Sequence, residues 1–290
     1  MRSTIRANAC YLWLALITGG GLLLRLWLWW RVPIHQPAND EVEYLQVAHD
    51  LIAGRGWVFY EQYHWLRAPL YPLFLAGSLL LGGEELRWAA LPNIAVSTLT
   101  IPLFYLLGHT VVLPAEPAPE GQSRAQRTGL FAAAICAMLL PFATFASLWM
   151  SETLFTALFA GAILVLLRWS RRPALPTAAL AGLLLGLAIL TRSAPLAAMP
   201  LLMSWMAWVG RRMGGLRRHL LGAAICLLMA LATVAPWTIR NWLAYGHFIA
   251  VETGLSYNLW AFYEPREDQD TIFRTLERIP NPGERSDYAT

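Results

Sequence analysis

The feature that most constrains this chain is a series of long apolar runs. The first, from Tyr11 to Trp30, matches the roughly 20 residues that a helix needs to cross the hydrocarbon core of a bilayer. Hydrophobic residues make up 57% of the 290 residues, and charged residues only 14%. Several such runs in a chain of this composition predict an all-α polytopic membrane protein.

Seven of the runs are predicted to span the membrane, separated by short loops. They are Tyr11–Trp30, Trp88–Leu113, Leu130–Leu148, Thr153–Leu167, Leu175–Thr191, Ala194–Val209 and Leu220–Thr238. The run from Pro69 to Gly82 is too short to span and is expected to lie along the outer surface. Residues 1–263 are predicted to form one membrane domain, and residues 264–290 a polar extracytoplasmic tail of a chain that is either complete or truncated.

The arginines predict which side of the membrane each loop faces. All 22 basic residues are arginine. With these seven spans, eleven arginines share the side of the N-terminus, whereas the short loops of the other side hold six. The positive-inside rule then places the N-terminus in the cytoplasm and residues 31–87 in the first extracytoplasmic loop. Sixteen of the 18 carboxylates fall on that outer side, so we expect the chemistry at the outer face of the inner (plasma) membrane.

The first polar segment after the first span, Asn39 to Tyr44, holds three carboxylates. Asp40 and Glu43 have the spacing of a capping box and open a predicted amphipathic helix. The apolar face of this helix consists of Tyr44, Leu45, Ala48, Leu51 and Ile52, and the helix ends at Gly54 and Gly56. This helix and the run from Pro69 to Gly82 are the two surface-lying helices of the predicted fold. Two interpretations of the acids remain open: capping of a first turn, or a reactive site.

Further polar side chains are expected at the outer ends of the helices. They are His64, Arg67, Glu152, Arg192, Arg240, Asn241 and His247. Several have a simpler alternative, such as headgroup anchoring by Arg67 and Arg240 or helix capping by Glu152. Arg192 lies in a turn between two short apolar arms, so we expect it below the outer headgroups, where an arginine needs an anion.

Three other features carry structural expectations. Arg25, within the first span, is expected to snorkel to the outer interface. The mixed sequence from His247 to Thr253 predicts a short strand or hairpin at the outer surface. The three cysteines have no paired spacing and lie in or beside apolar runs, which predicts core packing and neither disulfides nor a metal site; they are Cys10, Cys136 and Cys226.

This set of side chains suits the transfer of a sugar from a lipid phosphate to an acceptor hydroxyl. The nucleophilic hydroxyl needs a base, for which Asp40 is predicted, whereas the departing phosphate needs positive charge. Arg67, Arg192 and Arg240 are predicted to bind that phosphate, because arginine grips phosphate oxygens in a bidentate fork.

Other residues are assigned supporting roles. Glu41, Glu152 and His247 are predicted to position the acceptor or a divalent metal ion, with Glu41 and His247 as the metal ligands. The net charge of +4 gives no reason to expect a nucleic-acid partner, because the arginines also serve as topology signals. The expected partners are the bilayer, a lipid-linked sugar donor and a lipid, glycan or protein acceptor.

Five short motifs carry a resemblance to a known family. They are Asp40-Glu41-x-x-Tyr44, Arg67-x-Pro69-Leu70-Tyr71-Pro72, Ser151-Glu152-x-Leu154-Phe155, Thr191-Arg192 after Gly182 to Leu190, and Pro236-Trp237-x-x-Arg240-Asn241. In this order they resemble the GT-C integral-membrane glycosyltransferases of the glycosyltransferase family 39 type, above all the protein O-mannosyltransferases and the bacterial aminoarabinose transferases that act on lipid A.

The resemblance implies a polyprenyl-phosphate sugar donor and a catalytic first extracytoplasmic loop. It matches Asp40 to the essential loop aspartate, Glu152 to an acidic residue at the start of the fourth helix, and Arg67 to the basic residue before two prolines. Ala68 stands where the family has the first of these prolines, and Arg67 where the aminoarabinose branch usually has lysine. The sugar and the acceptor are therefore left open.

Two alternatives to an active transferase are kept. A membrane transporter or lipid flippase would show inverted repeats, interrupted helices and charge near the bilayer midplane, and the sequence displays neither repeat nor midplane charge. A non-catalytic or truncated GT-C homologue would keep the fold without the activity.

Overall fold

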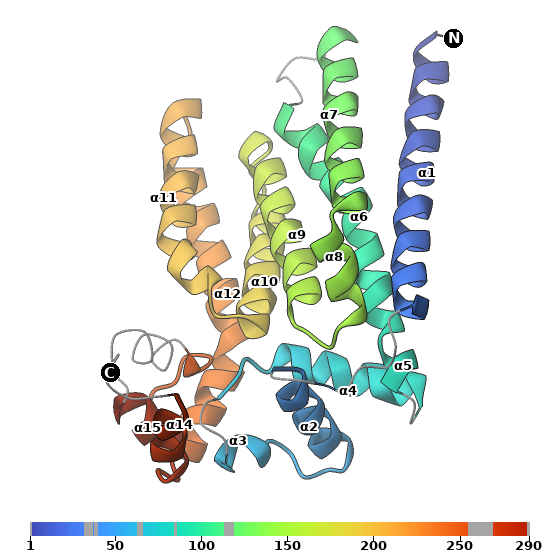
Figure 1. Cartoon of the computed structure of the whole chain (residues 1–290). Helices are drawn as coiled ribbons and strands as arrows, with labels where there is room; N and C mark the ends of the chain where they lie inside the picture. Colours follow the sequence, from blue (N-terminus) through green and yellow to red (C-terminus); the bar gives the residue numbers. More distant parts are fainter. Residues whose placement is uncertain are drawn as a thin grey trace.

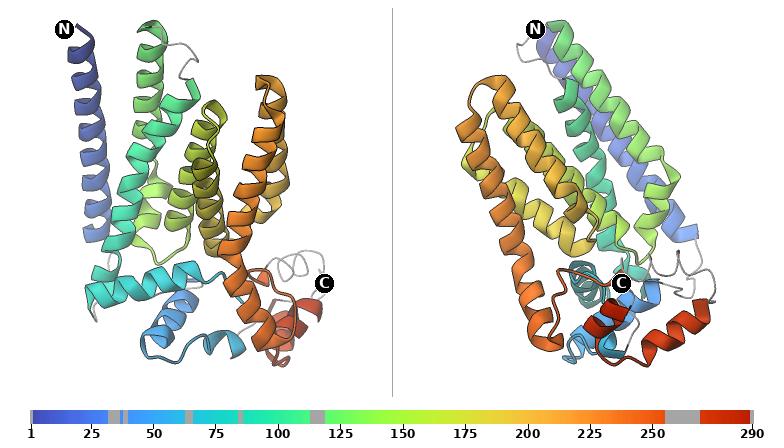
Figure 2. Two further views of the ribbon diagram at one scale, coloured as in Figure 1. Left: turned by 180° about the vertical axis from the view of Figure 1, so that it is seen from behind. Right: turned by 90° about the vertical axis from the view of Figure 1, so that its left-hand side faces the viewer.

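The computed structural model describes residues 2–31, 37, 40–62, 66–83, 86–112, 119–254 and 269–288, and the regular structure within these ranges is all helical. The expectation for His64 falls outside them. Long helices stand side by side in a bundle, with shorter helices gathered across one end (Figures 1 and 2). The bundle contains α1 (Arg2–Arg31), α6 (Leu91–Val112), α7 (Pro119–Met138), α9 (Glu152–Arg171), α10 (Leu175–Thr191), α11 (Pro195–Met213) and α12 (Leu216–Tyr245).

The elements across the end include the acidic helix. They are α2 (Asp40–Ile52), α3 (Phe59–Gln62), α4 (Leu70–Gly82), α5 (Leu86–Ala89), α14 (Gln269–Glu277) and α15 (Pro282–Tyr288). The N-terminus lies at the opposite end of the bundle (Figure 1). We call the end that carries α2 and α4 the loop end.

Within the described ranges, four helical segments are long and apolar enough to cross a membrane: α1, α6 together with α5, α9 and α12. A fifth span results if α7 and the short elements α8 (Leu140–Thr144) and η1 (Phe145–Ser147) are taken together. Large apolar side chains on these helices are exposed, among them Trp13, Leu23 and Leu228. Such a surface is what lipid contact requires, and it agrees with the predicted helical membrane protein.

The predicted span Leu130–Leu148 is not one continuous helix, because the chain bends by 61° between α7 and α8. Pro141 follows the bend, and a proline lacks the amide hydrogen that would continue the helix. The carbonyls freed at the end of α7 are bonded by Arg25, whose Nη2 donates to Cys136 O (3.4 Å) and Nη1 to Ala137 O (3.3 Å). A guanidinium at the negative end of a helix dipole is favourable.

Arg25 therefore does not snorkel as predicted. Its side chain is completely buried, and its remaining donors reach Ser97 Oγ (2.7 Å) and Gly21 O (3.0 Å). Ser97 in turn donates to Phe142 O, and Asn93, one turn earlier on α6, donates to Phe145 O and Leu148 O. The carbonyls of the broken segment are thus satisfied by side chains of α1 and α6, as a lipid environment demands.

The other half of the bundle is held by close backbone packing. A Cβ on Gly182 of α10 would lie 2.2 Å from Cys226 O of α12, and one on Gly186 would lie 2.5 Å from the Thr233 side chain. Small residues allow two membrane helices to approach in this way. All three cysteines are buried and unpaired, which confirms their predicted role in packing.

At the loop end, α2 packs on α4. Tyr44, Leu45 and Ala48 of α2 form a buried cluster with Tyr71 and Leu75 of α4. The predicted apolar face is largely confirmed, but Ile52 is 41% exposed. The glycines end the helix as predicted, since Gly54 and Gly56 both have φ of 73°, a left-handed conformation that glycine adopts readily.

The predicted strand or hairpin at His247 to Thr253 is wrong, because this segment has no regular secondary structure. It follows Gly246, the left-handed C-cap of α12, and folds back along that helix. Asn281, just before α15, donates to Tyr245 O (2.7 Å), so the C-terminal helices are also tied to the end of α12.

Candidate functional site

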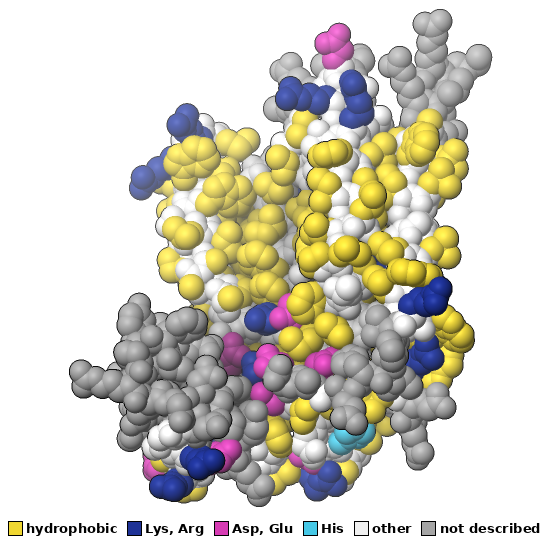
Figure 3. Space-filling view, viewed as in Figure 1, with side chains coloured by type: hydrophobic (Ala, Val, Ile, Leu, Met, Phe, Trp, Pro, Cys, Tyr) yellow, Lys and Arg dark blue, Asp and Glu magenta, His cyan; other side chains and the backbone are white. Residues whose placement is uncertain are grey.

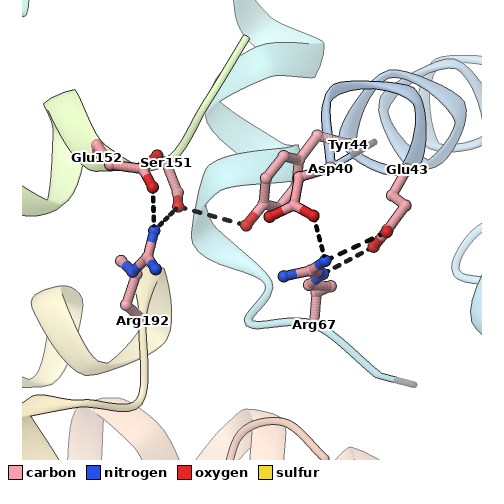
Figure 4. A network of polar contacts seen from close by, with 7 residues as sticks. All are labelled: Asp40, Glu43, Tyr44, Arg67, Ser151, Glu152 and Arg192. Carbon is pink, nitrogen blue, oxygen red and sulfur yellow. Dashed lines mark hydrogen bonds and ion pairs between the residues drawn. The ribbon is translucent and has the colours of Figure 1, made fainter. Parts of the chain in front are cut away.

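The charged side chains of the loop end meet where α2 and the start of α4 face the first turn of α9 and the turn between α10 and α11. Figure 4 shows five of these charged residues together with Ser151 and Tyr44, arranged as two clusters joined by the tyrosine. We call them the Arg67 cluster (Asp40, Glu43 and Arg67) and the Arg192 cluster (Ser151, Glu152 and Arg192).

In the Arg67 cluster, one guanidinium binds two carboxylates. Arg67 Nε donates to Glu43 Oε2 (2.7 Å), and Nη2 donates to both Asp40 Oδ1 (2.7 Å) and Glu43 Oε1 (3.2 Å). The Glu43 side chain is only 4% exposed, and that of Asp40 is 36% exposed. The acids predicted to form a capping box therefore both turn toward Arg67, and Asp40 Oδ2 receives no hydrogen bond from the described residues.

Burial and charge act in opposite directions on Arg67. Burial alone lowers the pKa of its guanidinium, but the hydrogen bond and charge of Glu43, together with Tyr44 and Asp40, raise that pKa above its usual value. The guanidinium also lies 5.7 Å from the centre of the Tyr44 ring, within cation–π range. Arg67 is therefore a permanent cation that the folded loop holds firmly.

In the Arg192 cluster, one guanidinium binds one carboxylate and one hydroxyl. Arg192 Nη1 donates to Glu152 Oε1 (2.5 Å) and to Ser151 Oγ (3.1 Å). The Arg192 side chain is 43% exposed, and its Nε and Nη2 make no hydrogen bond with the described residues. On the carboxylate, Glu152 Oε2 is buried without a hydrogen-bond partner.

Tyr44 connects the two clusters. Its hydroxyl donates to Ser151 Oγ (3.3 Å), so Ser151 accepts from both Tyr44 and Arg192 and does not cap α9 with its side chain. Burial of the ring raises the pKa of Tyr44, and the neighbouring carboxylates Asp40 and Glu252 raise it further, whereas Arg67 and the Ser151 hydrogen bond lower it. Tyr44 is therefore neutral and acts as a donor at this junction.

The remaining predicted site residues are distributed differently. Glu41 is buried and accepts a hydrogen bond from Trp149 N (3.1 Å), which fastens α2 to the segment that leads into α9. Arg240 joins neither cluster: it stacks on Trp237 and Tyr245 and donates to Tyr245 Oη (2.7 Å). No carboxylate among the described residues pairs with it.

The predicted metal ligands, Glu41 and His247, contact different parts of the described chain. Glu41 lies against Trp149, whereas the ring of His247 lies against Gly283 of α15, where an added Cβ would be 2.3 Å from His247 Cγ. The part of the chain that the structure describes holds no group of three or more metal-binding side chains. A divalent ion remains a prediction.

Sequence reasoning missed Glu252 and the serine that it binds. Glu252 Oε1 accepts hydrogen bonds from both N (3.1 Å) and Oγ of Ser193, the residue after Arg192. The next residue, Thr253, pairs with Leu66, the residue before Arg67. Only the position of Glu252, downstream of an outer helix end, could have suggested a role in the site.

The described residues form a cavity beside the Arg192 cluster and a separate apolar groove. A cavity of about 140 Å³ is lined by Glu152, Thr153 and Thr156 of α9, by Ser97 and Thr100 of α6, and by the broken segment. A larger groove of about 350 Å³ runs between α11 and α12 and is almost wholly apolar; Leu196, Met199, Leu231, Val234 and Phe248 are among its lining residues. Figure 3 shows charged side chains gathered below the apolar part of the bundle.

Comparison with known proteins gives this chain no relative: it matches no protein-family model, no curated protein and no solved structure.

Proposed function

We propose that this protein is a membrane glycosyltransferase that moves a sugar from a polyprenyl phosphate to an acceptor hydroxyl at the loop end of the bundle. The observation that carries the proposal is the meeting of the Arg67 and Arg192 clusters at the loop end of the bundle (Figure 4). Together they offer what the reaction needs, namely a carboxylate with an open oxygen and cations for a phosphate.

Asp40 is the proposed base. The acceptor oxygen attacks the anomeric carbon of the sugar, Asp40 Oδ2 takes the hydroxyl proton, and the bond from the anomeric carbon to the phosphate oxygen breaks with its electron pair left on the phosphate. Glu43 suits this role poorly because both of its oxygens are bonded to Arg67. Glu41 is also unsuitable because its side chain is buried against Trp149.

Arg192 is the proposed first contact of the donor phosphate. Its Nε and Nη2 bond none of the described residues and its side chain is 43% exposed, so one edge of the guanidinium suits bidentate binding of phosphate oxygens. Arg240, without a carboxylate partner among the described residues, supplies a second charge. The apolar groove between α11 and α12 supports a lipid-linked donor, since it ends near the outer part of α12 that carries Arg240.

The proposed topology has seven passes, with α10 and α11 crossing the bilayer beside the longer helices. The chain order alternates the direction of these helices, so that the N-terminus and α15 lie at opposite ends (Figure 1). A reporter fused after Arg171 is expected to lie in the cytoplasm, and one after Tyr63 outside. A reporter found outside after Gly121 would contradict both the proposed seven passes and the extracytoplasmic site in the plasma membrane.

A transporter or lipid flippase is the second candidate, and the break between α7 and α8 favours it, since transporters often use interrupted helices. The buried Arg25 is likewise a charge within a span. All three nitrogen atoms of Arg25, however, donate to Ser97 or to carbonyls of α1 and α7. Arg25 therefore hydrogen-bonds the carbonyls freed at the break, and few of its N–H groups are left to bind a transported substrate.

The test is a transfer assay with purified protein in lipid nanodiscs. A polyprenyl-phosphate hexose with a labelled sugar is supplied, and loss of the donor is followed beside the Asp40→Asn variant prepared in the same way. Donor loss that requires Asp40 supports the proposal. Equal donor loss by both proteins contradicts Asp40 as the base. No donor loss by the wild-type protein across hexose and pentose donors contradicts the transferase and leaves a non-catalytic homologue or a transporter.

A further inference from the structure

The segment from Ile249 to Thr253 is fastened at every residue although it has no regular secondary structure. Three side chains of α12 bond its first three carbonyls: Asn241 to Ile249 O (3.2 Å), Thr238 to Ala250 O (2.7 Å) and Trp237 to Val251 O (2.7 Å). Ile249 and Val251 are also buried in the main core cluster. Residues 249–251 are therefore held in place by α12.

The last two residues of the segment reach the neighbours of two arginines. Glu252 Oε1 accepts from N and Oγ of Ser193, which follows Arg192. Thr253 N donates to Leu66 O (3.0 Å), and Leu66 N donates to Thr253 Oγ1 (2.9 Å), directly before Arg67. Two adjacent residues thus anchor the chain beside both arginines.

We infer that residues 249–253 are a positioning element that sets Arg67 and Arg192 relative to one another, with Glu252 and Thr253 as the positioning residues. The physical reason is that neither arginine lies within a helix: Arg67 precedes α4, and Arg192 is the C-cap of α10, held to that helix by its backbone N–H alone. Residues 249–253 are anchored to α12, so they can hold both arginines at fixed positions relative to that helix. The consequence for phosphate binding rests on the proposed function, whereas the coupling of the two connections does not.

The coupling is tested by hydrogen exchange with mass spectrometry on the full-length protein in nanodiscs. In Glu252→Ala, the acceptor of the Ser193 amide is lost, so peptides covering residues 192–194 are expected to exchange about fivefold faster, the factor that corresponds to one net hydrogen bond of about 1 kcal/mol. The inference further requires faster exchange at residues 66–67, which Glu252 does not touch. Thr253→Val is expected to give the reciprocal result at residues 192–194.

Conservative and distant variants serve as controls. Glu252→Gln keeps a carbonyl oxygen for Ser193 and is expected to restore exchange to within about twofold of the wild-type protein. Glu120→Ala, at an exposed position in the first turn of α7, and Thr144→Val, at an exposed position of α8, are expected to change neither peptide. If each variant affects only the connection that it touches, the two contacts are independent and the inference is wrong.

A binding measurement separates this inference from the proposed function. Farnesyl phosphate, a short isoprenyl monophosphate, is titrated against the wild-type protein and Glu252→Ala, and the affinity of the variant is expected to fall about tenfold with recovery in Glu252→Gln. No binding to the wild-type protein contradicts phosphate recognition, while the exchange data still decide the coupling. Coupled exchange with unchanged affinity would overturn the role of the segment in phosphate binding.

Discussion

The Arg67 and Arg192 clusters use the same kinds of residue but differ in how far their side chains are shielded from solvent. Arg67 is 19% exposed and holds two carboxylates, one of them nearly inaccessible. Arg192 is 43% exposed and holds one carboxylate that is itself 31% exposed. An ion pair removed from water depends strongly on both partners, whereas an exposed one contributes little to stability. The first cluster is therefore built to hold the loop, and the second retains the capacity to bind a ligand.

The difference also separates the roles of the two acids next to the proposed chemistry. Asp40 Oδ1 accepts from Arg67, and Oδ2 accepts from none of the described residues. Arg67 therefore fixes the orientation of the carboxylate while one oxygen stays available to take a proton. Glu152 has one oxygen on Arg192 and a second that is buried without a partner. A phosphate on the open edge of Arg192 would leave the Glu152 pair in place, and Asp40 likewise keeps its pair with Arg67.

The largest expected effect is on transfer in Asp40→Asn. The amide oxygen can still accept from Arg67, but the amide cannot take the proton of the acceptor, so activity is expected to fall about 10²- to 10⁴-fold. Asp50→Asn is the matched control, because Asp50 lies on the same helix and pairs with Arg55 (2.6 Å) away from the clusters. Near wild-type transfer in Asp40→Asn, measured as product formed per folded protein, would remove Asp40 as the base.

The next largest effect separates the two arginines by stability. Arg67→Ala leaves the buried Glu43 without its cation and is expected to lower the free energy of unfolding by about 3 kcal/mol. Arg192→Ala removes an exposed pair and is expected to lower it by less than about 1 kcal/mol. Thermal unfolding in detergent, followed by tryptophan fluorescence, compares the two variants. Equal destabilisation by the two substitutions would mean that the ion pairs of the two clusters do not differ in their contribution to stability.

A smaller effect is expected on phosphate affinity. Arg192→Ala should weaken farnesyl phosphate binding about tenfold, the loss of one charge-assisted hydrogen bond, and Arg192→Lys should restore only part of it because lysine lacks the planar fork. Arg87→Ala is the control, since Arg87 stacks on Trp29 and Trp30 at the same end of the bundle. Similar losses in the Arg192 and Arg87 variants would indicate a general charge effect and no specific site.

The sequence predicts those parts of the fold that depend on local pattern. The predicted run Leu175–Thr191 has the same first and last residues as the helix α10, because it is apolar throughout and bounded by polar turns. The acidic helix also begins and ends as expected. The break after α7 was missed because its stability depends on Arg25, which lies 112 residues from Ala137 in sequence. No local pattern records that contact.

The sequence predicted which residues meet at the candidate site better than it predicted which of them form pairs. Asp40, Arg67, Glu152 and Arg192 do converge, but as two carboxylate–arginine clusters and not as free arginines around one acid. Which carboxylate an arginine binds is decided by tertiary contacts, such as that of Tyr44 with Ser151 across 107 residues. Glu252 was missed for the same reason, because its partner Ser193 belongs to another connection.

The smallest effect concerns Tyr44, the only side chain that Figure 4 shows between the clusters. Because its pKa is raised in the folded protein, the folded state keeps a proton that the unfolded state loses above its ordinary pKa of about 10. The stabilisation from the neutral tyrosine is thus fully present below pH 10 and is lost as the pH rises toward the folded pKa. Tyr44→Phe removes this titration, so its unfolding free energy should fall less steeply above pH 10 than that of the wild-type protein, by up to about 1.4 kcal/mol per pH unit. Thermal unfolding between pH 8 and pH 11 measures this slope, with Tyr11→Phe at an exposed position as the control. Identical slopes for Tyr44→Phe and the wild-type protein would mean that Tyr44 does not join the clusters as a neutral donor.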